Sequence, residues 1–125
     1  PESARAAIAV LGQAPGKKLL VLGDMGELGA DTAALHAQIG SAARSHGVDW
    51  LYTLGEPSAH AAHAFGSGAR HFQHVEDLVA EVGKRLAPTV TVLVKGSRFM
   101  RMERVVNALA LSGAERGARR EEANR

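Results

Sequence analysis

The stretch "KKLLVLGDMGELG" (Lys17–Gly29) joins a continuous apolar run to a loop with three glycines spaced three residues apart. An unbroken apolar run of this kind is typical of a strand that is buried on both faces, as in a parallel sheet covered by helices. The glycines allow the chain to turn sharply from the strand into the next element. The stretch therefore predicts a strand over residues 17–23 and a loop at its carboxyl end.

Helices and short strands alternate along the rest of the chain, without an internal repeat. Because strands separated by helices pair in parallel through right-handed crossovers, we expect an α/β fold. Its mainly parallel sheet would carry helices on both faces. Apolar residues at helical spacing predict helices over residues 1–12, 32–45, 57–66, 75–88 and 97–111. Apolar or β-branched runs predict further strands over residues 50–55, 70–73 and 89–96.

The 125 residues are enough for one domain with a single core, which we assign to residues 1–111. Residues 112–125 are small, polar and charged, so we expect a disordered tail there. Arginine and glutamate alternate in this tail, the net charge is only +2 and aromatic residues make up 4% of the chain. These features argue against a nucleic-acid-binding protein.

The sequence contains no cysteine, which excludes disulfides and thiolate metal sites. No apolar run reaches the roughly 20 residues that span a bilayer, and the first residues do not resemble a signal peptide. We therefore expect no membrane contact and a cytoplasmic location.

In parallel sheets, ligands bind at the carboxyl ends of the strands. Three loops rich in glycine and polar residues fall at such ends, namely residues 23–29, 55–58 and 95–98. The sequence therefore predicts that any functional site lies where these loops meet.

The loop "GDMGELG" (Gly23–Gly29) does not match the G-x-G-x-x-G pattern of dinucleotide-binding folds, and it lacks the Lys-Ser/Thr ending of a P-loop. Asp24 and Glu27 would repel a phosphate unless a cation intervened. Asp24, just beyond the strand, is the better candidate to accept ligand hydroxyls or to hold a cation. A simple strand-to-helix turn is an equally good explanation of the spacing.

The loop "KGSR" (Lys95–Arg98) places two cations where a buried strand meets the start of a helix. Ser97 can cap that helix, and free N–H groups and the helix dipole attract an anion there. Lys95 and Arg98 thus predict a site for a carboxylate or a phosphate. The alternative is a capped helix with two solvated cations.

Among the six histidines, His36 lies in the first turns of the helix after "GDMGELG" and is able to orient that loop by a hydrogen bond. A half-buried structural histidine is the alternative. His60, His63, His71 and His74 lack acidic partners at metal-ligand spacing, so we assign them surface or packing roles and predict no metal site.

Several motifs of the chain recur together in one known family. They are "VLGDMGELG" (21–29), His36, "IGSAARSHGVDWLYTLG" (39–55), "HF" (71–72) and "VLVKGSRFMRMERVVNAL" (92–109). Together they resemble the C-terminal domain of the Mur ligases, the ATP-dependent amide ligases of bacterial peptidoglycan synthesis, and the resemblance covers about residues 1–109. Within the family, the motifs are most similar to those of the members that join D-alanyl-D-alanine to UDP-N-acetylmuramoyl-tripeptide. Phe99 departs from the pattern, because small or polar residues are common there.

The resemblance implies a Rossmann-like domain that closes over a central ATPase domain in a monomeric ligase, with a further N-terminal domain for the UDP-sugar peptide. ATP and Mg²⁺ would serve the whole enzyme, with the Mg²⁺ ligands outside this chain, and the chain alone would be inactive. Family roles transfer residue by residue. Asp24 and Glu27 would face ATP, Lys95 and Arg98 would act in catalysis, and Lys95, Ser97, Arg98 and His36 would bind substrate.

Three other interpretations stay open. The chain is compatible with another amide ligase of the same superfamily, such as one of the other Mur ligases or folylpolyglutamate synthase. It is also compatible with a non-catalytic module that binds a nucleotide or an anion. A purely structural interaction domain is the third.

Overall fold

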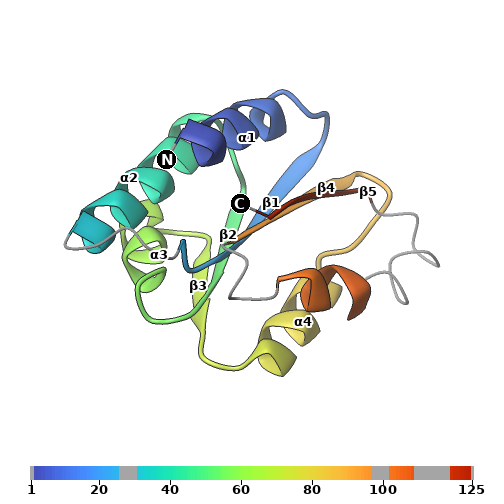
Figure 1. Ribbon diagram of the computed structural model, residues 1–125. Coiled ribbons are helices and arrows are strands. Elements are labelled where there is room, and N and C mark those ends of the chain that lie inside the picture. Colours follow the sequence, from blue (N-terminus) through green and yellow to red (C-terminus); the bar gives the residue numbers. More distant parts are fainter. Residues whose placement is uncertain (1, 26–30, 97–101, 109–118, 125) are drawn as a thin grey trace.

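The computed structural model describes residues 2–25, 31–96, 102–108 and 119–124 (Figure 1). Residues 103–108 form a short helical segment between β4 and β5. The labelled elements are α1 (Glu2–Gly12), β1 (Lys17–Gly23), α2 (Thr32–Ser45), β2 (Trp50–Leu54), α3 (Ala59–Phe65), β3 (Ala69–Phe72), α4 (Val75–Gly83), β4 (Val90–Gly96) and β5 (Arg119–Asn124).

The described strands form one parallel sheet in the order β3-β2-β1-β4-β5. In the register, Leu22 of β1 lies opposite Thr53 of β2 on one side and Lys95 of β4 on the other. The expectation of an α/β fold with a mainly parallel sheet is confirmed. The strand at residues 17–23 and the helix at residues 32–45 have the predicted bounds.

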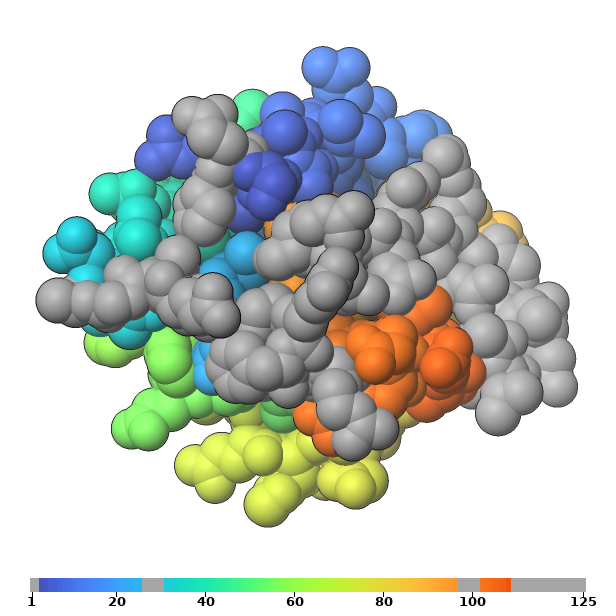
Figure 2. Space-filling model, in the orientation of Figure 1, coloured from blue at the N-terminus to red at the C-terminus, as the bar shows by residue number. Residues whose placement is uncertain are grey.

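Helices cover both faces of the sheet, as the continuous apolar strands require (Figure 1). Leu20 and Leu22 of β1 point to one face, where they pack with α1, α2 and α3. Leu19 and Val21 point to the other face, where they pack with α4 and the segment 103–108. In the space-filling view, α1 and α2 (blue to cyan) and α4 with the segment 103–108 (yellow and orange) lie on opposite sides of the molecule (Figure 2).

The order of the strands reverses direction beside β1. From β1 the chain moves outward through α2 to β2 and through α3 to β3, and then α4 carries it back past β1 to β4. The connections before and after this return therefore lie on opposite faces of the sheet, so the strand order switches between β1 and β4, and open parallel sheets bind ligands at the carboxyl ends of strands at such a point.

The helix predicted over residues 75–88 ends earlier, at Gly83. Glycine is a poor helix former. The backbone N–H groups of the two residues after Gly83 bond to carbonyls three residues back, whereas an α-helix bonds four residues back. Lys84 donates to the carbonyl of Glu81, and Arg85 donates to the carbonyl of Val82. Leu86 nevertheless remains in the core, with 7% of its surface exposed.

The expectation of a disordered tail is wrong for residues 119–124, which pair with β4 as strand β5. The edge of β4 offers a row of backbone N–H and C=O groups, and an extended segment can bond to them whatever its side chains. Composition reports on side chains alone, so it missed this backbone pairing. The remaining tail residues, 112–118 and 125, lie outside the described residues.

Within the described part of the chain, no helix has both the length and the apolar character needed to cross a membrane.

Candidate functional site at the carboxyl edge of the sheet

The carboxyl ends of β1, β2 and β4 meet at one edge of the sheet, since the three strands are parallel neighbours. Gly23 ends β1 opposite Leu54 at the end of β2, and Gly96 ends β4 on the other side. Two of the three loops that the sequence singled out thus begin at the neighbouring ends of β1 and β4. The third begins at the end of β2.

Asp24 follows β1 directly, and only 9% of its surface is exposed. Its carboxylate oxygen Oδ1 accepts a hydrogen bond from the backbone N–H of Ser58, at 2.9 Å. The side chain therefore turns across the end of β2 rather than outward into solvent. Asp24 joins the loop after β1 to the loop after β2, a structural role that the sequence did not reveal.

The loop after β2 is shaped to receive this carboxylate. Gly55 has a φ of +101°, a conformation that residues with a side chain rarely adopt. A Cβ atom at Gly55 would lie 2.3 Å from Oδ2 of Asp24, so a side chain there would displace the carboxylate. The hydroxyl of Ser58 donates to the carbonyls of Leu54 and Gly55, at 2.9 and 2.8 Å. Gly55 and Ser58 are site residues to which sequence reasoning assigned no role.

His36 is fully buried, with 0% of its surface exposed. Its Nε2 accepts a hydrogen bond from the backbone N–H of Met25 at 3.0 Å, and its Nδ1 lies 2.7 Å from the carbonyl oxygen of Thr32. The suggestion that His36 orients the loop after β1 agrees with these contacts. A direct substrate contact does not, because both ring nitrogens are already used inside the protein.

Lys95 is also buried, with 2% of its surface exposed. It lies on the face of β4 that α1 covers, and its ammonium donates a hydrogen bond to the hydroxyl of Ser3 at 3.2 Å. Long lysine stems bury their methylene groups while the charged end stays near a polar rim. The expected cation is present at the strand end, but it points beneath the first turn of α1 rather than into open solvent.

Glu27, Ser97 and Arg98 lie outside the described residues, as does Phe99. Their proposed roles in ligand binding therefore stay predictions. The ends of the strands from which their loops start are described, and these ends are close together.

Met102 packs over the ends of β1 and β4 on the face of the sheet that carries α4, and it is fully buried. A Cβ atom at Gly23 would lie 2.6 Å from its sulfur, and one at Gly96 would lie 2.6 Å from its Cγ. The glycines that end β1 and β4 thus leave room for one methionine side chain, which holds both strand ends together.

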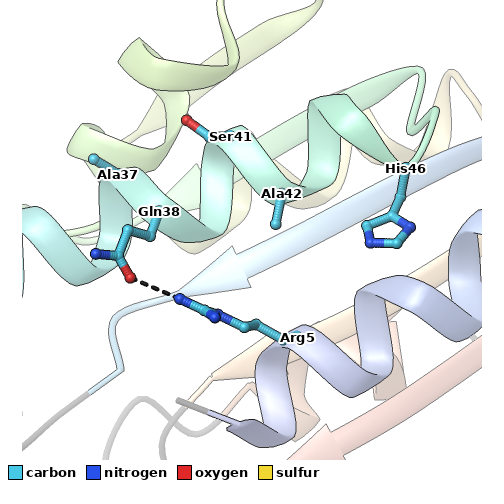
Figure 3. A pocket seen from close by; sticks show the side chains of 6 residues that line it. All are labelled: Arg5, Ala37, Gln38, Ser41, Ala42 and His46. Atoms are coloured by element: carbon cyan, nitrogen blue, oxygen red, sulfur yellow. Dashed lines mark hydrogen bonds between the residues drawn. The ribbon is translucent and has the colours of Figure 1, made fainter.

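A groove of about 490 Å³ lies elsewhere, between α1 and α2 (Figure 3). Arg5 reaches across it and donates to the side-chain carbonyl of Gln38 at 2.9 Å. None of the residues that line the groove belongs to the strand-end loops. It is therefore separate from the site described above. The lining residues are Arg5, Ala37, Gln38, Ser41, Ala42 and His46.

In the part of the chain that the structure describes, no group of three or more histidines and acids gathers at a distance suited to a metal ion. His71 instead lies 2.7 Å from the hydroxyl of Thr53, through Nδ1. His74 precedes α4 without capping it through its side chain.

Residues 1–98 match the family model of the Mur ligase, glutamate ligase domain. The chain belongs to this family.

Two relatives, both named UDP-N-acetylmuramoyl-tripeptide–D-alanyl-D-alanine ligase, come from Escherichia coli and Bacillus subtilis. The first is 42% identical over 113 residues, covering 89% of this chain and 25% of the relative. The second is 32% identical over 99 residues, covering 75% of this chain and 22% of the relative.

Solved structures of Mur ligases share the fold. A MurF ligase from Thermotoga maritima in complex with ADP has a TM-score of 0.80 and 25% identity, covering 93% of this chain and 27% of that chain. MurF from Acinetobacter baumannii has a TM-score of 0.75 and 30% identity, covering 87% of this chain and 25% of that chain. The chain thus spans about a quarter of the length of the Mur ligases that it matches.

Proposed function

We propose that this chain forms the C-terminal domain of a UDP-N-acetylmuramoyl-tripeptide–D-alanyl-D-alanine ligase. The observation that carries the proposal is that the carboxyl ends of β1 and β4 are neighbours in the sheet, at the point where the strand order switches. Asp24 and Lys95, from the two motifs on which the resemblance rests, lie at these two strand ends. The relatives with this activity in their names match most of the chain.

In the proposed reaction, the carboxylate of the tripeptide attacks the γ-phosphorus of ATP, which gives an acyl phosphate and ADP. The amine of D-alanyl-D-alanine then attacks the acyl carbon, and the tetrahedral intermediate expels phosphate as the amide forms. An acyl phosphate hydrolyses in water, so the site has to be closed during this step. Closure of this domain over the central ATPase domain would exclude that water.

The loop after β1 would face ATP. Asp24 supports this role because its carboxylate lies at the carboxyl end of a central strand, where parallel sheets bind ligands. Glu27, in the same loop, is the second candidate for this contact.

The loop after β4 would hold the carboxylate of the dipeptide or the charge that develops on the phosphate. Arg98 and Ser97 would contact the anion, and Lys95 would add positive charge from beneath α1. A preorganised cation at such a position contributes several kcal/mol to transition-state stability. Catalytic roles for Lys95 and Arg98 are part of this proposal.

Mg²⁺ would neutralise the phosphates of ATP in the whole enzyme. The described residues of this chain do not fit a protein-built metal site, since no cluster of three or more acids and histidines occurs among them. We therefore assign the Mg²⁺ ligands to the rest of the ligase, and we assign the tripeptide to its other domains. A monomeric state and a cytoplasmic location are part of the same proposal.

The test is phosphate release from ATP by the full-length ligase with UDP-N-acetylmuramoyl-tripeptide, in the presence and absence of D-alanyl-D-alanine. Release that depends on the dipeptide is the expected result. A nucleotide- or anion-binding module without catalysis would give no release, although calorimetry would still detect ATP binding. Release that requires a different acceptor would point to another amide ligase of the superfamily.

Variants at the loop after β4 then test the assigned roles. Arg98→Ala should raise the KM for the dipeptide and lower kcat, and Lys95→Met should lower kcat. Lys17→Met is the matched control, because Lys17 lies at the amino end of β1, at the opposite edge of the sheet, with a side chain that is 64% exposed. Unchanged kinetics for Arg98→Ala would contradict the assignment of this loop.

A further inference from the structure

We infer that His36 is a positioning residue that fixes the backbone at Asp24 through the Met25 N–H. The inference deepens the proposed function and rests on it, because Asp24 is the residue that would face ATP. It replaces the expectation that His36 touches substrate. The ring of His36 is fully buried, and it contacts the loop after β1 by accepting a hydrogen bond from the backbone N–H of Met25.

The hydrogen bonds of the ring define its tautomer. A backbone N–H can only donate, so Nε2 of His36 must accept the hydrogen bond from Met25 through its lone pair. The proton of the neutral ring is then on Nδ1, which donates to the carbonyl of Thr32 in the first turn of α2. One ring therefore ties the end of β1 to the start of the next helix.

The contact with Met25 reaches Asp24 through the peptide bond. The N–H of Met25 and the carbonyl of Asp24 belong to the same planar unit, so fixing one fixes the other. The hydrogen bond from Ser58 holds the carboxylate of Asp24 at the same time. His36 thus controls the backbone of Asp24, while Ser58 controls its side chain.

Two substitutions separate the two contacts of the ring. In His36→Gln, the side-chain carbonyl reaches the position of Nε2 and accepts from Met25. In His36→Asn, the shorter amide reaches only the position of Nδ1 and donates to Thr32, so the Met25 N–H loses its acceptor. The control is His63→Asn on α3, since His63 is exposed and distant from this contact in sequence.

Steady-state kinetics of the full-length ligase give the first readout. We expect His36→Asn to lower kcat/KM for ATP by about tenfold or more, because a buried N–H is left without a partner. His36→Gln should stay within about twofold of the parent enzyme, and the KM for D-alanyl-D-alanine should not change in either variant. A role in stability alone would instead affect both substrates, and equal losses in the two variants would overturn the inference.

Hydrogen–deuterium exchange gives a second readout that needs no activity. In the full-length protein, the amide of Met25 should exchange faster in His36→Asn than in the parent, and His36→Gln should restore the slow exchange. If the parent shows no dipeptide-dependent phosphate release, the proposed function fails, and the exchange data still decide whether His36 fixes this peptide. Unchanged exchange at Met25 in His36→Asn would overturn the inference itself.

Discussion

The carboxylate of Asp24 accepts a hydrogen bond from the backbone N–H of Ser58, which lies 34 residues further along the chain. This contact joins the ends of two neighbouring strands at the edge where the proposed site lies. Asp24 is almost fully buried, so the Ser58 N–H has little access to water as a substitute partner. The residue that we propose to face ATP therefore also stabilises the loop beside it.

The two roles of Asp24 can be separated by substitution. Asp24→Ala leaves a buried N–H without an acceptor and should destabilise the domain by about 1–3 kcal/mol. Asp24→Asn keeps an oxygen at the position of Oδ1, so its unfolding midpoint in urea should stay close to that of the parent. If the negative charge serves the reaction, Asp24→Asn should nevertheless lose turnover. Full activity of this variant would show that the charge has no role in the reaction.

Gly55 should tolerate no side chain, in contrast to Gly47. Both have positive φ values, +101° and +82°, but a Cβ at Gly47 meets no atom within 4 Å. Gly47→Ala should therefore cost only the backbone strain, about 1–2 kcal/mol in urea unfolding. Gly55→Ala adds a collision with the Asp24 carboxylate, so it should cost more and also reduce turnover. Equal effects of the two substitutions would mean that the collision is relieved at no cost.

The central elements could be predicted from the sequence because burial alone determines them. The apolar run at residues 19–22 is typical of a strand covered on both faces, and in the structure the strand that contains it, residues 17–23, lies in the middle of the sheet. Strand β5 could not be predicted, because it is held by backbone pairing with β4 and its composition is that of a solvated segment.

The site was only partly predictable for a similar reason. Parallel topology indicated which loops meet, but no pattern in the sequence pairs Asp24 with Ser58. The burial of His36 did have a signal, since His36, Ile39 and Ala43 follow helical spacing and form the buried side of α2. The partner of the ring, the N–H of Met25, required coordinates.

Glu81 should make the stability of the domain depend on pH in the acid range. Its carboxylate lies 2.9 Å from Nη1 of Arg70 and 3.1 Å from Nζ of Lys84. The hydrogen bond from Lys84, together with the charges of Lys84 and Arg70, lowers the pKa of Glu81 below its ordinary value of 4.5. A lowered folded-state pKa contributes stability above that ordinary value, and this stability is lost as the pH falls through the folded-state pKa.

Glu81→Gln removes this dependence. The variant should melt slightly below the parent at pH 7, and the difference in Tm should vanish at a pH well under the ordinary value for a glutamate. The expected difference is small because the partner side chains, Arg70 at 54% and Lys84 at 71% exposed, leave both ion pairs open to screening by solvent. A Tm difference that stays constant across this range would contradict the assigned role of the charge.

Met102 should couple energetically to the glycines at the ends of β1 and β4. Gly23→Ala places a methyl group against the methionine sulfur, and such overpacking should cost about 1–3 kcal/mol. Met102→Ala opens a cavity and should cost about 2–5 kcal/mol. In the double variant the new methyl group occupies part of that cavity, so the combined loss in urea unfolding should be smaller than the sum of the two.

Gly96 should couple to Met102 in the same way. Its Cβ would meet Cγ of Met102 at 2.6 Å, whereas its distance of 3.4 Å from the backbone of Gly23 is an ordinary van der Waals contact. Met102→Ala should therefore relieve Gly96→Ala about as completely as it relieves Gly23→Ala, as measured by urea unfolding of the single and double variants. Strict additivity in both pairs would show that Met102 does not hold these strand ends together.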